Sequence, residues 1–476
     1  MKLSQILEAD LISNEKVSEK YWENYSEEIS KKLWLPQLTD SQDLDRMNCL
    51  PTSFKNSRLI LQSLITNESK THRLNLPKTY YQLSQYFPPD TMEDAIITVT
   101  RKVRFYPNKP QRELLNKCFG AHRYFYNRTI ERINNKIKLN KSEIVPRNKT
   151  LIDNDIWMKE IPLDTREYGM RKALDAYKTS LALLKQGKIK HFKLSYLSRK
   201  YNTQVCYVDK RALNNGLLFP QKLKENAKLF AKKDKRFLKK SLGTFPIIRE
   251  NDGKYYACVL INKIVRKFEK ENTICALDPG VRTFQTLYSE KEIIEFGYKT
   301  QNQIRKLYNK IDNYTSKITK KKSHVKHTMK RKCAKWRTKI QHIIRDLHWK
   351  VCNYLTNEYD VILLPVFKTQ EMTSKDNKKI KKCTRREMLQ MSHYKFKEKL
   401  KYKCKIRNKT VIICKENYTT KTCGSCGKIN NNLGGQKIFK CDCGIKVDRD
   451  VNGSRNILIR SLTKLQGSMM QLPSSG

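Results

Sequence analysis

The chain has 476 residues, enough for about two or three domains with hydrophobic cores. Its 98 Lys+Arg against 46 Asp+Glu give a net charge of +52, an excess that indicates a polyanionic partner, most often nucleic acid. No stretch approaches the roughly 18 apolar residues of a membrane span, and acidic residues near the start argue against a secretory signal, so we expect an intracellular protein without membrane contact.

The charge is unevenly distributed along the chain. Residues 1–94 contain 11 Lys+Arg and 14 Asp+Glu, a net of −3, so the residues from 95 onward carry +55. We therefore expect the polyanion-binding part to begin near residue 95. The role of the first 94 residues, mixed in charge and rich in loops, does not follow from their sequence.

The first regular pattern begins at Ile96. "IITVTRKVRFYPN" alternates, with Val103 and Phe105 on one face and Lys102 and Arg104 on the other, which predicts a strand that presents cations. From Lys109 the pattern predicts a helix with an aromatic cluster, formed by Phe119, Tyr124, Phe125 and Tyr126.

The next stretch predicts a second helix, a basic strand region and a hairpin. The helix begins at "DTREYG", where Asp164 and Glu167 have the spacing of a capping box. "GKIKHFKLSYLSRK" predicts the basic strand region. "FPIIRENDGKYYACVLI" predicts the hairpin, turning at Asp252-Gly253.

After this hairpin, strands alternate with helices. "TICALDPG", "TFQTLYS" and "EIIEFGY" predict three strands, residues 301–350 a helical segment, and "YDVILLPVF" and "TVIICKEN" two further strands. This order is typical of a ribonuclease-H-like α/β fold. The helical segment has 16 Lys/Arg and two acids, which favours contact with nucleic acid. Its apolar stripe predicts core packing by Trp336, Ile340, Ile344, Leu347 and Val351.

Four of the fourteen cysteines are clustered, in "TCGSCG" and "KCDCG". Two close pairs of thiolates separated by a loop are typical of a tetrahedral zinc ribbon with no open coordination position. We therefore expect one structural Zn²⁺ rather than disulfides. The second pair has the tighter C-x-C spacing, which we expect to strain the backbone. The predicted ligands are Cys423, Cys426, Cys441 and Cys443.

Two aspartates are candidate ligands for a second metal. Asp278 ends an apolar strand and is followed by Pro279-Gly280, so it could also be a simple turn residue. Asp450 lies at the head of a helix, where it could also be an N-cap. Together, in a strongly basic chain, they predict a Mg²⁺ site, which would activate water for phosphodiester cleavage.

Four motifs resemble those of a known family. "ALDPGVRTF", "TRREMLQMSHYKFKEKLKYK", "ENYTTKTCGSCG" and "VDRDVNGSRNIL", in this order, are similar to the transposon-encoded TnpB nucleases, and most of all to their eukaryotic and viral Fanzor branch. The resemblance covers roughly residues 96–466. It implies guide-RNA-directed cleavage of double-stranded DNA next to a short target-adjacent motif, with one protein per RNA. It also implies a nuclear location in a eukaryotic host.

The resemblance further implies a multidomain α/β architecture. A RuvC (ribonuclease-H-like) nuclease domain with a zinc-ribbon insert would follow a β-rich wedge domain and a helical recognition domain. Candidate contacts to nucleic-acid backbones are Arg101, Lys102, Arg104, Lys188, Lys190 and Lys193, although basic strands are often merely solvated. The expected division is an N-terminal extension (1–94), the wedge domain (95–110 and 186–270), the recognition domain (111–185), the first part of the RuvC domain (271–413, with a basic helical segment at 301–358), the target-nucleic-acid-binding insert with a RuvC strand end at its start (414–447), the final RuvC motif and helix (448–466) and a tail (467–476).

The third catalytic carboxylate is not where TnpB has it. In TnpB the second RuvC motif ends in glutamate, and here that position is Pro365. The Fanzor resemblance implies a relocated glutamate, Glu416, with Glu371 as the alternative. Two other functions stay open: a catalytically silent RNA-guided DNA-binding protein, and a zinc-ribbon DNA-binding protein without guide RNA.

Overall fold

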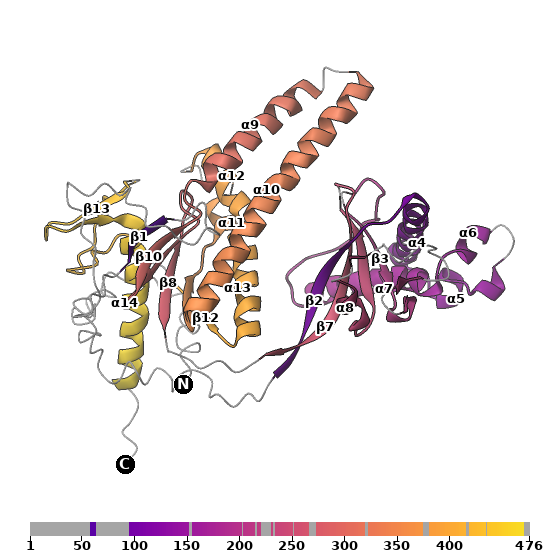
Figure 1. The fold of residues 1–476 in the computed structure, drawn as a ribbon, viewed down its shortest axis with the longest axis horizontal. Helices are drawn as coiled ribbons and strands as arrows, with labels where there is room; N and C mark the ends of the chain where they lie inside the picture. Colours follow the sequence, from indigo (N-terminus) through magenta and orange to yellow (C-terminus); the bar gives the residue numbers. More distant parts are fainter. Residues whose placement is uncertain are drawn as a thin grey trace, which may run out of the picture. The chain divides into compact units, whose positions relative to one another are not determined.

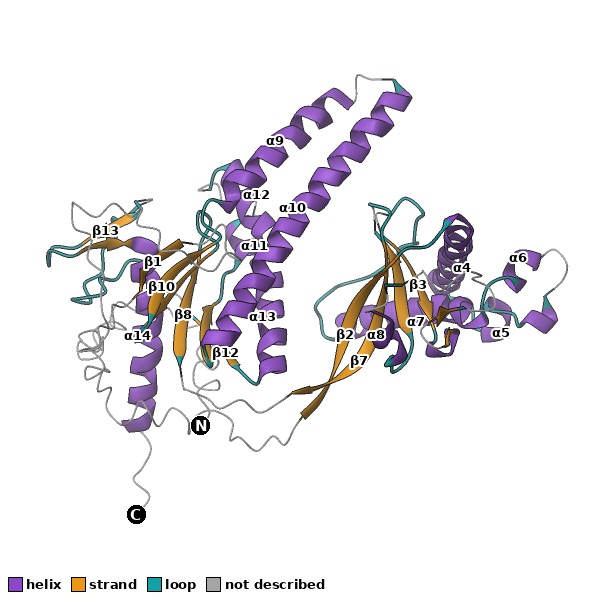
Figure 2. Ribbon diagram, in the orientation of Figure 1, coloured by secondary structure: helices purple, strands orange, loops and turns teal. Residues whose placement is uncertain are grey.

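The computed structural model forms two compact units, one from residues 96–264 and one from the residues on either side of them. Their elements are drawn in Figure 1 by position in the sequence and in Figure 2 by type. The described residues are 58–62, 95–151, 155–201, 203–214, 217–219, 230–231, 234–250, 252–265, 273–318, 322–374, 380–415, 418–434 and 436–470.

The first unit is built around a four-stranded sheet in the order β2-β7-β6-β3. Val103 and Phe105 of β2 are buried and Lys102 and Arg104 are exposed, which confirms the predicted alternation. The predicted hairpin is also confirmed, because Gly253 turns the chain between β6 and β7 with φ +80°. The strands are β2 (Ala95–Phe105), β3 (Gln204–Val208), β6 (Phe245–Arg249) and β7 (Tyr255–Val265).

Two long helices complete the core of this unit. Asn108 caps α4 through a capping box with Gln111, and Phe119 and Phe125 of this helix are buried. The predicted helix is thus confirmed, and of its aromatic cluster Phe119 and Phe125 lie in the core, whereas Tyr124 is 44% exposed. The helices and short elements are α4 (Lys109–Asn134), α5 (Lys141–Ile144), α6 (Ile156–Lys159), α7 (Leu163–Lys185), α8 (Lys235–Lys239), the 3-10 turns Asn148–Thr150 and Lys210–Ala212, and a two-stranded ribbon of Leu213–Asn214 and Leu217–Leu218.

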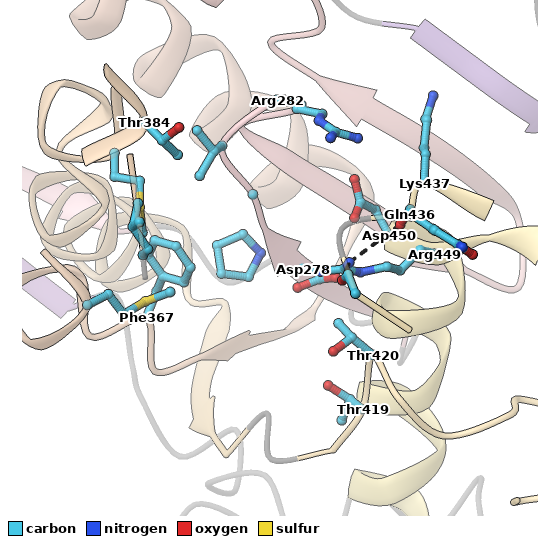
Figure 3. Close-up of a pocket in the computed structure, with 17 residues that line it drawn as sticks. Asp278, Arg282, Phe367, Thr384, Thr419, Thr420, Gln436, Lys437, Arg449 and Asp450 are labelled. Carbon is cyan, nitrogen blue, oxygen red and sulfur yellow. Dashed lines mark hydrogen bonds between the residues drawn. The ribbon is translucent and has the colours of Figure 1, made fainter. Parts of the chain in front are cut away.

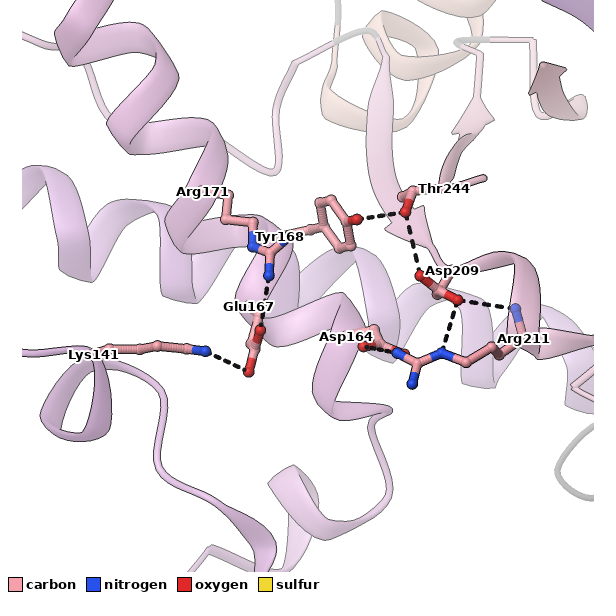
Figure 4. A network of polar contacts seen from close by, with 8 residues as sticks. All are labelled: Lys141, Asp164, Glu167, Tyr168, Arg171, Asp209, Arg211 and Thr244. Carbon is pink, nitrogen blue, oxygen red and sulfur yellow. Dashed lines mark hydrogen bonds and ion pairs between the residues drawn. The ribbon is translucent and has the colours of Figure 1, made fainter. Parts of the chain in front are cut away.

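The capping box predicted for α7 is wrong. The helix begins at Leu163 with Pro162 as its N-cap, so Asp164 already lies in the first turn and cannot cap it. Asp164 instead pairs with Arg211 at 3.1 Å, and Glu167 pairs with Lys141 at 3.1 Å and with Arg171 at 3.4 Å (Figure 4). These acids tie the start of α7 to neighbouring segments rather than to its own backbone.

The predicted basic strand region around residues 188–193 is also wrong. Residues 191–198 form no strand, because side chains of α4 take the place of a neighbouring strand. Asn127 exchanges two hydrogen bonds with the backbone of Leu197, of 2.7 and 3.0 Å, and Asn134 donates to the carbonyl of Leu194 at 3.1 Å.

The second unit contains a six-stranded sheet in the order β1-β10-β9-β8-β11-β12. The strands β8, β9 and β10 are antiparallel, whereas β11 and β12 run parallel to β8. This confirms the ribonuclease-H-like order expected from the sequence. An additional edge strand, β1, pairs with β10 and comes from the N-terminal segment. The strands are β1 (Arg58–Gln62), β8 (Ile274–Pro279), β9 (Gln285–Ser289), β10 (Glu292–Phe296), β11 (Val361–Pro365) and β12 (Thr410–Cys414).

Helices cover both faces of this sheet. Ala276 and Leu363 share one hydrophobic cluster with Val451 and Ile459 of α14, whereas Cys275 and Ile362 point into the cluster on the other face. That second cluster includes residues of α9, α10 and α13. All five strand residues of β11 are buried, as expected for a central parallel strand. The helices are α9 (Thr300–Ile318), α10 (Ser323–Glu358), α11 (Thr369–Met372), α12 (Lys382–Met391), α13 (His393–Arg407) and α14 (Arg449–Met470).

The basic segment of residues 301–350 forms two helices lying side by side, α9 and α10 (Figure 1). Tyr314 and Trp336 contact each other across them, with ring centroids 4.8 Å apart. The apolar stripe of α10 lies in the core as predicted. None of the described helices is long and apolar enough to cross a bilayer.

Two buried histidines make the second unit sensitive to acid. His348 and His393 stack on either side of Phe284, with ring centroids 5.0 and 5.1 Å away. Burial lowers the pKa of His348 to about 3, with Lys399 adding to the shift, and burial lowers the pKa of His393 to about 4. The folded state keeps both neutral, so their stabilisation is complete above pH ~6.5 and declines as the pH falls toward these values.

We therefore expect the free energy of unfolding to fall by on the order of 2 kcal/mol per histidine between pH 7 and pH 5. Urea denaturation at the two pH values measures it. His393→Phe keeps a ring in the stack and should show a smaller decrease, whereas His327→Gln, at an exposed site on α10, should behave like the wild type. An undiminished decrease in His393→Phe would contradict this account.

Candidate metal centres

Asp278 is presented at the end of β8 by a tight turn. Its side chain is 8% exposed, and the strand ends at the next residue, Pro279. A Cβ atom at Gly280 would lie 2.7 Å from the carbonyl oxygen of Thr283, so the turn needs glycine there. Asp278 is therefore held by the strand and by its turn, and it lines a cavity.

Asp450 lies in the first turn of α14 but does not cap this helix. The carboxylate of Asp448 accepts hydrogen bonds from the backbone N–H groups of Asp450, at 2.9 Å, and Val451, at 3.4 Å. The alternative role predicted for Asp450 is thus filled by Asp448. The side chain of Asp450 lines the same cavity as Asp278 (Figure 3).

A glycine allows α14 to approach Asp278. A Cβ atom at Gly453 would lie 2.5 Å from Oδ2 of Asp278 and 3.1 Å from Cγ2 of Thr420. Any larger residue would push the carboxylate or the helix away. Gly453, one turn after Asp450, therefore decides how closely the two aspartates can lie.

The cavity that both aspartates line has a volume of about 440 Å³. Burial, together with the charge of Asp448, raises the pKa of Asp450, while Arg449, Lys437 and Arg282 oppose the shift. A bound cation would remove this penalty on the ionised carboxylate. Carboxylate oxygens are the ligands that Mg²⁺ prefers, so the two aspartates fit the predicted magnesium site.

The register of the sheet gives the position of Pro365. Residues of β11 pair with those of β8 87 positions earlier in the chain, as Leu363 does with Ala276. Extending this register places Pro365 level with Asp278, and on its other side Pro365 pairs with Cys414. The three parallel strands thus end side by side, and the central one carries no acid at this level.

The third acid is not found among the described residues of the cavity. Asp278 and Asp450 are the acids among its described lining residues. Glu371 pairs with Lys368 at 3.1 Å, and its side chain is 68% exposed on α11. Glu416, two positions after Cys414, lies outside the described residues.

The four clustered cysteines come together as predicted. Their sulfur atoms all lie within 4.8 Å of one another, and the Cys423–Cys443 and Cys426–Cys441 pairs are each 3.6 Å apart. Zinc bonded to four thiolates would separate the sulfurs by about 3.8 Å. The cluster therefore fits a tetrahedral Zn²⁺.

We expected backbone strain at the C-x-C pair, and in the structure a glycine occupies the position with positive φ. Gly427 and Gly444, which follow the two pairs, have φ +74° and +85°. The turn that contains the C-x-C pair closes through two hydrogen bonds of 3.0 Å. Cys441 N–H donates to the carbonyl of Ile445, and Gly444 N–H donates to the carbonyl of Cys441. Because glycine adopts positive φ freely, this turn carries little strain. It joins β13 (Ile438–Lys440) to β14 (Lys446–Asp448).

Buried polar residues of α14, which sequence reasoning missed, hold the cysteine loop. Asn452 accepts from Gly424 N–H at 3.0 Å and donates to the carbonyl of Thr422 at 2.7 Å. Asn456 donates to the same carbonyl at 2.8 Å, and Arg455 donates to the carbonyl of Gly424. Polar residues at positions i, i+3 and i+4 within an otherwise apolar helix were the available signal.

The predicted nucleic-acid contacts are exposed cations with aromatic neighbours. Lys102 pairs with Glu250 and lies 4.0 Å from the ring centre of Tyr256, and Arg101 lies 4.7 Å from that of Phe237. Arg104 lies over its neighbour Tyr106. Their contact with nucleic acid stays a prediction, as does that of the exposed lysines 188, 190 and 193.

The cysteine cluster yields the first prediction for these centres. We expect one Zn²⁺ per chain, and Cys426→Ser should lose it because three thiolates hold the ion less tightly. Elemental analysis after gel filtration measures the stoichiometry. Cys383→Ser, which changes an exposed cysteine outside the cluster, is the matched control and should keep the ion. Full zinc content in Cys426→Ser would contradict the assignment.

A second prediction concerns Gly453. Gly453→Ala should weaken divalent-cation binding roughly 10- to 100-fold, because the added methyl group displaces the carboxylate of Asp278. Titration with Mn²⁺, followed by electron paramagnetic resonance, gives the affinity.

Ser454→Ala is the neighbouring control, since it removes only a 3.0 Å hydrogen bond to the carbonyl of Val451. Equal affinities in the two variants would mean that the approach of α14 does not matter for the metal.

Comparison with known proteins identifies related sequences. A family model described as "Cas12f1-like, TNB domain" matches residues 393–457, and one described as "Helix-turn-helix domain" matches residues 97–142. In this chain the second region comprises strand β2, helix α4 and the beginning of α5.

Relatives that align with most of the chain come from viruses and bacteria. A candidate transposase of Paramecium bursaria Chlorella virus 1 is 30% identical over 390 residues, 78% of this chain and 88% of the relative. A TnpB-like protein of Acanthamoeba polyphaga mimivirus is 26% identical over 80% of this chain and 79% of its own length. A candidate RNA-guided DNA endonuclease of Escherichia coli (strain K12) is 24% identical over 78% and 94%. The chain belongs to the Fanzor/TnpB family of transposon-encoded proteins.

Proposed function

We propose that this protein is an RNA-guided DNA endonuclease that cleaves phosphodiester bonds with Mg²⁺ in a RuvC site. The observation that carries the proposal is the shared cavity of Asp278 and Asp450 at the end of a ribonuclease-H-like sheet. The name of the Escherichia coli relative supports the reaction class.

The residues that line the cavity have different roles in the proposed cleavage. Asp278 and Asp450 hold the metal, and Gly453 sets their approach. Bound Mg²⁺ would activate water as the nucleophile and stabilise the leaving oxygen. Arg282, Lys437 and Arg449, which line the same cavity, offset the charge of the phosphate and of the carboxylates.

We assign the third metal ligand to Glu416. In sequence it comes two positions after Cys414, the last residue of β12, and neighbouring strands such as β11 and β12 lie about 4.8 Å apart, a distance that a glutamate side chain can span in part. Glu371 is the weaker alternative, because it pairs with Lys368 on an exposed helix. The register that places Pro365 beside Asp278 supports a relocated acid.

The basic surfaces supply contacts to a guide RNA and a double-stranded DNA target. The two acids of residues 301–350 are already paired, Asp312 with Arg386 at 2.7 Å and Asp346 with Lys350 at 2.8 Å, so most described cations of this stretch have no acid within it to neutralise them. In such effectors base pairing reads the sequence, while the protein reads a short target-adjacent motif. One protein would bind one RNA, with the wedge and recognition domains in residues 95–270. In a eukaryotic host the complex would act in the nucleus.

We expect protein purified with its RNA to cut plasmid DNA in Mg²⁺, and Asp278→Ala and Asp450→Ala to abolish cutting while DNA binding remains. Each loses a carboxylate that would hold the metal. Gel analysis of the plasmid and filter binding measure the two properties. Glu416→Ala should lose cutting as well, and Glu371→Ala should retain it.

The outcomes separate the competing functions. Cutting by Asp278→Ala would overturn the active site, and cutting by Glu416→Ala would overturn the third ligand. Binding without cutting by the wild type would favour a catalytically silent RNA-guided DNA-binding protein. The absence of an acid at Pro365 is the observation that favours this alternative. Absence of a ribonuclease-protected RNA would favour a DNA-binding protein without a guide.

A further inference from the structure

The catalytic cavity has two unlike walls. Asp278, Asp450 and the cations lie along one side, and Phe367 lies on the other (Figure 3). Five further apolar residues line the cavity, namely Pro279, Val281, Met372, Ile380 and Met388, and Thr384 lies on the same side as Phe367. We call Phe367 with Met372, Ile380 and Met388 the apolar wall.

Contacts with His393 and with helix α9 hold the apolar wall in place. The ring of Phe367 lies 4.6 Å from that of His393, and Met388 is 1% exposed. Helix α12, which carries Met388, is tied to α9 by ion pairs of 2.5 Å between Arg305 and Glu387 and 2.7 Å between Arg386 and Asp312. The wall is thus a fixed surface rather than a loose cover.

A ligand that suits both walls is anionic at one end and flat and apolar at the other. We propose that the apolar wall receives the base of a nucleotide next to the scissile phosphate, while the phosphate lies at the aspartates and cations. This rests on the proposed nuclease function. A volume of about 440 Å³ is in the range of small-ligand sites, roughly 300–1,000 Å³.

This docking sets the substrate class at the cut. A base inside a duplex is stacked on its neighbours and cannot offer its face to Phe367, so it must be single-stranded or turned out of the helix. Stacking on an aromatic ring suits every base, and methionine adapts its shape. Because the wall is mainly apolar, it selects an unpaired nucleotide but hardly discriminates among the four bases.

The test combines a protein change with a substrate change. Targets with one abasic residue, placed in turn at each position around the cut, are cleaved by the wild type and by Phe367→Ala. We expect the wild type to lose roughly tenfold in rate at one position, and Phe367→Ala to be roughly tenfold slower on intact DNA with no further loss at that position.

Matched variants distinguish a loss of base docking from a loss of the folded structure. Met372→Ala changes a half-buried residue of the wall and should repeat the result. Leu389→Ala, on the same helix α12 but 56% exposed and outside the cavity, should keep the wild-type pattern. If no position is sensitive to base removal, or if the losses from Phe367→Ala and the abasic residue multiply, the proposal is overturned.

A second readout does not depend on cutting. In the Asp278→Ala protein with its RNA, a short single-stranded DNA containing 2-aminopurine should change fluorescence on docking, and the Phe367→Ala double variant should lose this change. Equal signals in the two proteins would overturn base docking. A wild type that cuts nothing would overturn the nuclease function, and the fluorescence would still decide the docking.

Discussion

The close approach of helix α14 to the end of strand β8 is the contact on which the candidate site depends. Gly453 leaves room for the carboxylate of Asp278, and Asp448 caps the helix so that Asp450 need not. Neither acid is placed by residues near it in sequence alone. The site forms only when the last helix packs on the sheet, which couples the two candidate ligands to the hydrophobic core of the unit.

The same helix also organises the cysteine cluster. Asn452 and Asn456 bind the backbone of Thr422, directly before Cys423, while Asp450 lines the cavity and Gly453 lies against Asp278. A helix repeats every 3.6 residues, so a single turn can serve two neighbouring sites. A change at the cysteine cluster would therefore affect the aspartates through the position of α14, without direct contact between the two sites.

Local patterns predicted much of this arrangement and failed where tertiary contacts replaced local ones. Alternation identified β2, apolar runs identified β8 and β11, and spacing identified the cysteines. The capping box failed because Asp164 pairs with Arg211 instead, and the basic strand failed because Asn127 holds that backbone. Strand β1 comes from a segment whose composition gives no sign of pairing with β10. The two aspartates that the sequence singles out line one cavity, whereas the role of Gly453 requires knowledge of a distance.

Pro365 is compatible with the sheet for a reason that concerns the site itself. The N–H of Val361 donates to Thr273 on the β8 side, and that of Val366 donates to Cys414 on the β12 side, both at 3.0 Å. Because these directions alternate, an N–H at position 365 would point toward β8, whose recorded pairing with β11 ends at Leu363. Because proline has no N–H, it cannot continue the hydrogen-bond ladder toward β8 at this position. The residue that stands level with Asp278 in place of an acid therefore also ends the pairing of β11 with β8.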